Sequence, residues 1–297
     1  MRIGIVTPVV VQLPGSHDEW EREAGIDQLA LIAATADRLG FHHLTCSEHV
    51  AVPAEDAAQR GGTYWDPLAT FGNLAAHTGR IRLATQVVVL SYHHPLAIAK
   101  RYGTLDRLSG GRLVLGVGVG SLRAEFDLLG APFDDRGARA DEAMRALRAC
   151  LSAREVAFHG EFYDFDDVVV EPHAVQDEVP MWVGGRTRRS LRRALAHGNG
   201  WVPFGLPLAE ISALLARADL PAGFDVVLGP NRALDPIGAA ASAARALDRL
   251  REAGATVAGV RITAASAEHY CEQLAALREI GRERGIPFDD ARSDGTR

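Results

Sequence analysis

Cysteine is scarce in this chain, and its cysteines are not placed for a disulfide or metal framework. Cys46, Cys150 and Cys271 are the three cysteines among 297 residues, and no CxxC pair occurs. Thiols so few and so widely spaced exclude a disulfide-rich secreted scaffold and a cysteine-based metal centre. The pattern favours a reducing compartment, so we expect a cytoplasmic protein without a metal.

Lysine and long apolar runs are also in short supply, and basic side chains are fewer than acidic ones. Lys100 is the single lysine, the formal net charge is −6, and the sequence pI is near 6.0. Nucleic-acid-binding domains are usually basic, and apolar runs of strand length are too short to span a membrane. Residues 2–6 already form a predicted strand, with no signal-peptide core before them. We therefore expect a small-molecule ligand, and neither nucleic acid nor a membrane as partner.

The stretch from residue 81 to residue 120 predicts a strand, a helix and a second strand. Residues 82–90 are a β-branched run typical of a strand buried on both faces. Pro95 suits the first turn of a helix, and Gly110-Gly111 suits its end. Residues 112–119 form another apolar run that ends in alternating glycines. Such a unit predicts parallel strands joined by a right-handed crossover.

The same alternation continues along the whole chain. Strands are expected at residues 2–7, 41–47, 82–90, 112–119, 181–184, 200–204, 224–228 and 257–263. Eight strands alternating with helices predict an α/β protein with a (β/α)8 TIM-barrel fold, and a doubly wound open sheet is the alternative. Residues 156–175 predict a hairpin inserted after strand four. We expect one domain over residues 1–286, followed by a polar, disordered tail at 287–297.

In a barrel the site lies at the carboxyl ends of the strands. Several polar or glycine-containing segments fall there, and we expect them around one mouth. They are Thr7-Pro8, Ser47-Glu48-His49, Gln86, residues 118–121, residues 184–186 and Val202-Pro203. The polar loop at residues 51–64 is long enough to cover the same mouth.

These segments match a family pattern in chain order. The matching stretches include ADRLGFHHLTCSEHV, the segment RIRLATQVVVLSYHHPLAIAKRYGTLDRLSGGRLVLGVGVG, and PMWVGGRTRRSLRRA. On these residues the chain resembles the luciferase-like monooxygenase superfamily, and most of all its branch of oxidoreductases that use the deazaflavin coenzyme F420. The resemblance covers residues 2 to about 205. It implies a barrel that binds a flavin-shaped ring in its mouth, and a homodimer.

The resemblance also assigns roles to individual residues. His49 and Glu48 match the family's catalytic acidic-His pair. A cis peptide bond is expected between Gln86 and Val87, behind the central ring of the cofactor. The implied cofactor-binding residues are Ser47, Gln86, Val87, Gly118, Gly120, Ser121, Glu125, Gly184, Gly185 and Arg186. Gly184-Gly185 would let the backbone approach a phosphate at a helix N-terminus.

Each of these residues also has a purely structural interpretation. His49 could be a hydrogen-bonded histidine of the barrel mouth, and Gly184-Gly185 a plain turn before a helix. Glu125 could orient the loop after strand four, pair with Arg123, or lie on a solvated helix face. For His93 and His94 a solvated loop is favoured over contact with substrate.

One position departs from the family pattern. The family's sugar-phosphate dehydrogenases carry a glutamate directly after the GxG of strand four, where this chain has Ser121. A single lysine also leaves no lysine set for a sugar phosphate. A sugar-phosphate substrate is therefore not expected, although the substrate itself stays open.

The sequence leads to one main function and two alternatives. The first is an F420-dependent oxidoreductase that transfers a hydride between the deazaflavin and a small organic substrate. The alternatives are an FMN-dependent monooxygenase supplied with reduced flavin by a separate reductase, and a non-catalytic flavin- or deazaflavin-binding protein. Five arginines between residues 186 and 193 favour F420, whose phosphate and glutamate tail are anionic. A solvated arginine face is the other interpretation, above all for Arg192 and Arg193.

Overall fold

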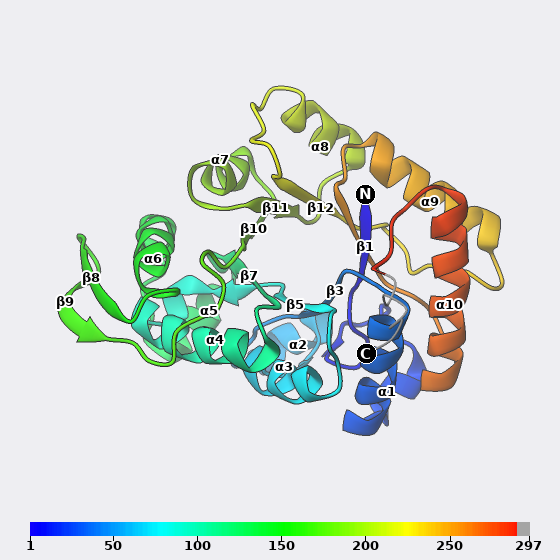
Figure 1. The fold of residues 1–297 in the computed structure, drawn as a ribbon, viewed down its shortest axis with the longest axis horizontal. Helices are drawn as coiled ribbons and strands as arrows, with labels where there is room; N and C mark the ends of the chain where they lie inside the picture. Colours follow the sequence, from blue (N-terminus) through cyan, green and yellow to red (C-terminus); the bar gives the residue numbers. More distant parts are fainter. Residues whose placement is uncertain (290–297) are drawn as a thin grey trace, which may run out of the picture.

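Eight parallel strands close into a barrel in the computed structural model, which describes residues 1–289. Strand β7 pairs with β10, and this pairing joins the two ends of the sheet into a ring (Figure 1). The barrel strands are β1 (Arg2–Ile5), β3 (His43–Cys46), β5 (Arg82–Thr85), β7 (Leu113–Gly118), β10 (Met181–Gly185), β11 (Gly200–Pro203), β12 (Asp225–Leu228) and β13 (Val257–Val260). The predicted TIM barrel is confirmed, and the open sheet is excluded.

Helices connect the strands and cover the outside of the barrel. They are α1 (Ile26–Arg38), α3 (Pro67–Ala76), α4 (Pro95–Ser109), α6 (Arg136–Cys150), α7 (Arg188–His197), α8 (Leu208–Leu215), α9 (Ala240–Glu252) and α10 (Ala267–Glu283). Local sequence sets several of their ends. The Asp66 carboxylate accepts a hydrogen bond from the Ala69 N–H at the start of α3, with Pro67 in the first turn. Gly110 adopts the left-handed conformation that ends α4.

Shorter elements occupy the loops. They are β2 (Val11–Gln12), η1 (Glu19–Arg22), α2 (Ala54–Arg60), β4 (Thr63–Tyr64), η2 (Leu90–Tyr92), α5 (Arg123–Leu129), β8 (Glu155–His159) and β9 (Asp164–Val169). The segment expected as a polar loop thus contains α2 and β4. Strand β4 pairs antiparallel with β2, which ties the loops after β1 and β3 together. Strands β8 and β9 form an antiparallel hairpin beside α6 (Figure 1).

The third barrel strand is interrupted, so the prediction of one strand over residues 82–90 is wrong. Strand β5 ends at Thr85, and a second short strand, β6 (Val88–Val89), pairs with β7 after it. The peptide bond between Gln86 and Val87 is cis, as the family resemblance implied. The break turns the Gln86 and Val87 side chains to new directions at the mouth of the barrel.

The apolar core has two layers. The larger layer lies between the barrel and the helices. The second is a smaller cluster of Ala84, Val114, Trp182, Val202, Val227 and Val257. Next to that cluster, the fully buried His43 ring fills the place that a side chain on Gly4 would take, 2.0 Å from its Cβ position. Trp182 Nε1–H donates to Asp225 at 3.2 Å. A polar network therefore lies at the end of the barrel opposite the mouth.

Residues 287–289, which the sequence analysis assigned to a disordered tail, are packed against the rest of the chain, so that part of the prediction is wrong. The Phe288 ring lies 5.3 Å from that of Phe41, and the Asp289 N–H donates to the Gly40 carbonyl. The rest of the predicted tail, residues 290–297, lies outside the described residues.

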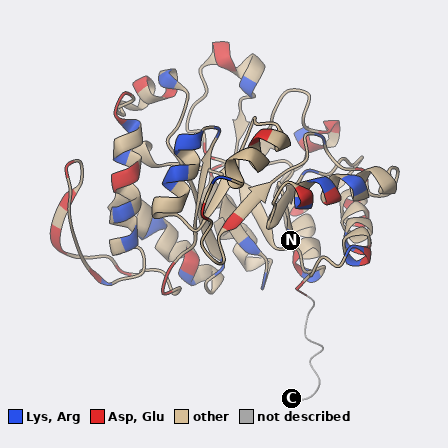
Figure 2. Cartoon of the chain, turned by 90° about the horizontal axis from the view of Figure 1, so that it is seen from above, with Lys and Arg blue, Asp and Glu red and all other residues tan. Residues whose placement is uncertain are grey.

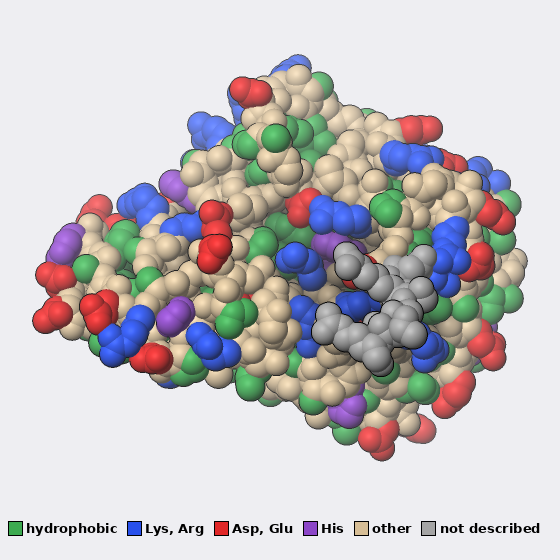
Figure 3. Space-filling view, viewed as in Figure 1, with side chains coloured by type: hydrophobic (Ala, Val, Ile, Leu, Met, Phe, Trp, Pro, Cys, Tyr) green, Lys and Arg blue, Asp and Glu red, His purple; other side chains and the backbone are tan. Residues whose placement is uncertain are grey.

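Charged side chains of both signs are mixed over the outer helices (Figure 2). On the face seen in Figure 3, basic side chains gather near the middle and mixed charges surround them. Within residues 1–289, none of the helices combines the length and the apolar character that spanning a membrane requires. The same residues contain no cluster of three or more side chains suited to hold a metal ion.

Candidate active site at the barrel mouth

His49 is held by a buried carboxylate from α5, the short helix that follows β7. Its Nδ1 lies 2.7 Å from Glu125 Oε2, and the Glu125 side chain is completely buried. The His49 side chain is 22% exposed, and its Nε2 has no hydrogen-bond partner among the described residues. The Tyr64 ring packs edge-on at 4.5 Å. One ring nitrogen is thus fixed, and the other is left for a ligand.

Glu125 organises the whole loop after β3. Besides His49, it accepts hydrogen bonds from the N–H groups of Val50 and Ala51 and from the Tyr92 hydroxyl. Burial alone would raise the pKa of this carboxyl, but the hydrogen bond and charge of His49, with the other donors, lower it overall. Glu125 therefore stays ionised. The solvated-face interpretation and the Arg123 pair are both wrong, since Arg123 binds Asp134 instead.

Glu48, the residue before His49, also holds neighbouring segments in place. Its Oε2 accepts the Val89 N–H at 2.7 Å, and its Oε1 lies 2.7 Å from His93 Nε2. The carboxylate is thereby committed to holding β6 and the turn after it. His93 is not a solvated loop residue as predicted, while the His94 ring accepts the Leu96 N–H at the start of α4. Glu48 is placed to position its neighbours rather than to meet a ligand.

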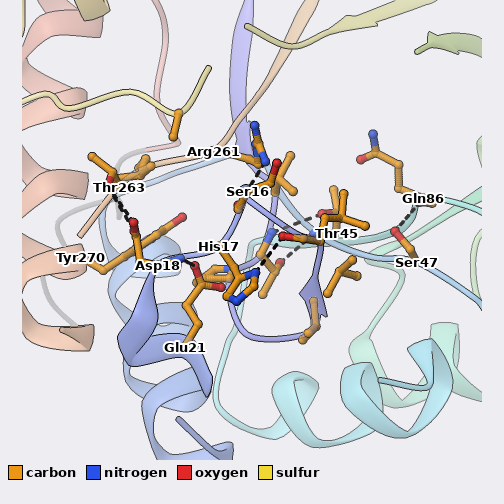
Figure 4. Close-up of a pocket in the computed structure, with 18 of the residues that line it drawn as sticks. Ser16, His17, Asp18, Glu21, Thr45, Ser47, Gln86, Arg261, Thr263 and Tyr270 are labelled. Atoms are coloured by element: carbon orange, nitrogen blue, oxygen red, sulfur yellow. Dashed lines mark hydrogen bonds between the residues drawn. The ribbon is translucent and has the colours of Figure 1, made fainter. Parts of the chain in front are cut away.

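Ser47 and Gln86 meet at the cis bond. The Ser47 hydroxyl donates to the Gln86 carbonyl at 2.6 Å. The Gln86 amide side chain makes no hydrogen bond within the described residues of the chain, and it points away from Ser47 into the mouth (Figure 4). These two predicted cofactor-binding residues are therefore in direct contact at the barrel mouth.

The predicted glycines make room for Val87. A Cβ on Gly118 would lie 2.6 Å from Val87 Cγ2, and one on Gly184 would lie 2.8 Å from Val87 Cγ1. A Cβ on Gly120 would meet the Phe126 ring and the Val89 side chain at under 3 Å. The absence of side chains thus lets the interrupted strand pack against β7 and β10. Ser121 follows as an exposed residue without a hydrogen bond in residues 1–289.

Helix α7 begins at Arg188, three residues after Gly185. Thr187 caps it, with its hydroxyl accepting the Ser190 N–H. Arg186, Arg188, Arg189 and Arg192 are exposed. Arg193 is buried and bound to Asp141 and to the Gly137 carbonyl. Four arginines, not five, are therefore available to a ligand near the helix N-terminus.

A cavity of 480 Å³ opens in the mouth on the side of β1 and β13 (Figure 4). Ser47 and Gln86 form one end of it, together with Thr7 and Thr45. The other end is formed by Asp18, Arg261, Thr263 and Tyr270, which the sequence analysis did not identify as site residues. Arg261 and Thr263 follow β13, so their position at a strand end could have suggested them, whereas Asp18 precedes η1 and Tyr270 lies in α10. The glycines at 118, 120, 184 and 185 lie outside this cavity.

A ring-shaped cofactor carrying an anion is compatible with this arrangement. Among the described residues the Gln86 amide is free and the His49 Nε2 lacks a partner, and four exposed arginines follow the glycine turn of β10. His49 and the arginines are not part of the cavity lining, so this set of groups lies beside the cavity. The chemistry of these groups, which donate hydrogen bonds or carry positive charge, suits a polar ring with an anionic extension. The residues present thus fit a flavin-type group.

Comparison with known proteins agrees with the fold. The family model described as luciferase-like monooxygenase matches residues 1–220. The uncharacterized protein Rv0953c of Mycobacterium tuberculosis is 32% identical over 211 residues, which are 66% of this chain and 75% of that protein. The crystal structure of monooxygenase RslO1 from Streptomyces bottropensis is 25% identical with a TM-score of 0.72, covering 96% of this chain and 100% of that one.

A further neighbour shows the fold alone. An F420-dependent secondary alcohol dehydrogenase, solved with an F420-acetone adduct, has a TM-score of 0.69 at 14% identity, over 93% of this chain and 98% of that one. The family match covers more than half of the chain, and the closed barrel agrees with the fold of these structural neighbours. The chain therefore belongs to the luciferase-like monooxygenase family, whose members are generally oxidoreductases.

Proposed function

We propose that this protein is an F420-dependent oxidoreductase that transfers a hydride between the deazaflavin and a small organic molecule. The observation that carries the proposal is the set of four exposed arginines at the start of α7, beside Gly184-Gly185. Hydride exchange is the chemistry that the cofactor supplies when bound. The protein contributes binding, orientation and exclusion of water.

The arginines need an anionic partner. Positive side chains at a helix N-terminus oppose the helix dipole, and Arg186, Arg188, Arg189 and Arg192 form no ion pair within residues 1–289. F420 carries a phosphate followed by a chain of glutamates, whereas FMN carries the phosphate only. A surplus of basic groups beyond one phosphate site therefore favours F420.

His49 and its partners supply the groups of the chain that would handle a proton. Glu125 fixes His49 Nδ1, so Nε2 is the atom left to donate a proton to, or accept one from, the substrate. Glu48 fixes Val89 and His93, and it thereby positions the segment after the cis bond. We propose Glu48 and Glu125 as positioning residues and His49 as the residue that meets the ligand.

An FMN-dependent monooxygenase is the second candidate. The RslO1 likeness favours it, because that protein is named a monooxygenase. It would use reduced flavin from a separate reductase and consume oxygen. A non-catalytic binding protein is the third candidate, motivated by Ser121 at the position of the family glutamate.

The test is a titration of the purified protein with F420 and with FMN at several salt concentrations. We expect tighter binding of F420, and an affinity that falls as salt rises because exposed charges are screened over about 8–10 Å. Arg188→Ala and Arg189→Ala should weaken F420 binding several-fold and leave FMN binding nearly unchanged. Arg217→Ala, an exposed arginine after α8, is the matched control.

Equal or tighter binding of FMN, with oxygen consumed when reduced FMN is supplied, would establish the monooxygenase instead. Tight binding with no turnover of any substrate in a broad panel would support the non-catalytic protein. F420 affinity that is flat with salt and unchanged in both variants would remove the arginines from the cofactor site.

A further inference from the structure

We propose that the β1 and β13 side of the barrel mouth is a binding pocket for an organic acid, a molecule with an apolar body and a carboxylate or similar anionic group. Its identification as the substrate pocket rests on the function proposed above, but its ligand class rests on the cavity alone. The pocket is the 480 Å³ cavity that runs from Gln86 to Tyr270.

Apolar side chains form part of the wall of this pocket, and polar side chains form the rest. Side chains from the end of β1, from the loop through β2, and from the end of β13 line it. They are Val6, Pro8, Val10, Val11, Leu13 and Ile262. An apolar body of the size of one or two rings would be removed from water here, which gives roughly 25 cal/mol for each Å² of apolar surface buried.

The two carboxylates at the pocket are already bound to protein donors. Glu21 accepts the N–H groups of Val9 and Asp18 at 2.7 and 2.9 Å. Asp18 accepts the Thr263 hydroxyl and the Ala264 N–H. Both carboxylates are thus held in fixed positions by protein donors, and their charges lie in the same pocket as those of Arg232 and Arg261.

The charged groups left with unused hydrogen-bonding atoms are donors, and the amides of Gln86 and Asn231, free within the described residues, offer both a donor and an acceptor. Arg261 uses only Nη1, which donates to the Ser16 carbonyl at 3.1 Å, and its other guanidinium nitrogens make no hydrogen bond within the described residues. Arg232, on the rim, is exposed and makes none there either. The Gln86 amide at the opposite end is also free. The pocket therefore offers hydrogen-bond donors and positive charge together.

Tyr270 provides a second and independent observation. It is 1% exposed, yet its hydroxyl has no hydrogen-bond partner among residues 1–289, and Figure 4 shows the oxygen directed toward the cavity. A buried polar group without a partner costs about 1–3 kcal/mol, so such groups are usually satisfied by a ligand or water. Burial raises the pKa of this phenol well above its ordinary value, which keeps the proton on the oxygen as a donor. Tyr270 and Arg261 thus both have unused donors, and both would bind a ligand that carries hydrogen-bond acceptors.

The experiment compares 2-naphthoate with 2-naphthamide, its uncharged analogue, by calorimetric titration of the full chain without cofactor. We expect the carboxylate to bind at least tenfold more tightly. Arg261→Met should remove most of this preference, and Arg232→Met a smaller share of it, while naphthamide binding stays unchanged. Tyr270→Phe should weaken naphthoate several-fold. Arg188→Met, in the proposed cofactor region, should leave the affinity for both compounds unchanged.

Equal binding of the two compounds, or a preference that survives Arg261→Met and Arg232→Met, would overturn the proposal. So would a failure of both naphthoate and decanoate to bind at millimolar concentration. Thermal melting of each variant shows that it is folded, and the exposed Arg232 gives a second variant if Arg261→Met is not. F420 and FMN are titrated on the same samples. If Arg261→Met weakens cofactor binding and leaves naphthoate binding unchanged, the pocket belongs to the cofactor and the proposal is overturned. If naphthoate binds but neither F420 nor FMN does, only the proposed function is refuted.

Discussion

At the scale of single residues, Glu125 decides what His49 can do. A histidine after a strand can be a ligand-binding group or a satisfied structural residue, and the sequence leaves both possible. The carboxylate that fixes His49 Nδ1 stands 76 positions later and is completely buried. It also gathers two backbone N–H groups and a tyrosine hydroxyl. Removal of this carboxylate would leave these four donors, including the half-buried His49 and Tyr92, without this partner.

We predict that Glu125→Ala lowers the free energy of unfolding by about 3–5 kcal/mol, because loss of one partner of a buried ion pair leaves the rest unpaired. Urea denaturation followed by tryptophan fluorescence measures it. Glu55→Ala, on the exposed face of α2, is the control and should stay within about 0.5 kcal/mol of the parent. A Glu125 variant as stable as the control would show that the loop does not depend on this carboxylate.

At the scale of elements, the break between β5 and β6 is accommodated by glycines on both neighbouring strands. Val87 projects into the space left by Gly118 of β7 and Gly184 of β10. The alternating glycines of the sequence therefore have a packing role in addition to any approach of a ligand. Because a β-carbon in either place would lie under 3 Å from Val87, the three positions form one packing unit.

We predict that Gly118→Ala destabilises the protein by about 1–3 kcal/mol through overpacking. In a Val87→Ala background the same substitution should cost much less, since the Cγ2 that it would meet is gone. A double-mutant cycle from urea denaturation measures this coupling. Gly72→Ala, on a helical glycine with open space around it, should be neutral or stabilising. Equal costs of Gly118→Ala in both backgrounds would contradict the packing unit.

At the scale of the whole molecule, the end of the barrel opposite the mouth makes stability depend on pH. Burial lowers the pKa of His42 to about 2 and that of His43 to about 3, with nearby positive groups adding to the effect. Both rings are therefore neutral in the folded protein at pH values where the unfolded chain begins to protonate them near 6.5. Protons bind the unfolded state more strongly, so stability must fall as the pH falls.

We predict a stability that is nearly constant above pH 7 and decreases between about pH 6.5 and 4.5, before carboxylates titrate. Each histidine contributes a slope of up to about 1.4 kcal/mol per pH unit. Urea denaturation across this range measures the slope. His42→Gln should reduce it by about half, whereas His77→Gln, an exposed site after α3, should leave it unchanged. A parent slope near zero would show that the network tolerates protonation.

Local patterns in the sequence were sufficient for the barrel. The β-branched runs, the helical periodicity and the Gly and Pro boundaries depend on neighbours within a few residues, and they predicted the strands and helices. The family pattern added the cis bond between Gln86 and Val87. The predicted barrel also placed Ser47, Gln86 and His49 at one mouth, because the carboxyl ends of parallel strands lie at the same end of a barrel.

Only the tertiary structure decided which polar side chains are committed to protein partners and which are free. His93 is bound by Glu48, Arg193 by Asp141, and Asp18 by the end of β13. Arg261 and Tyr270 keep unused donors at the end of the cavity that the sequence analysis did not identify. The physical reason is that burial and hydrogen-bond pairing depend on contacts between distant segments, such as Asp18 and Ala264 at 246 positions apart. Residue type and local spacing do not predict contacts between segments so far apart in the sequence.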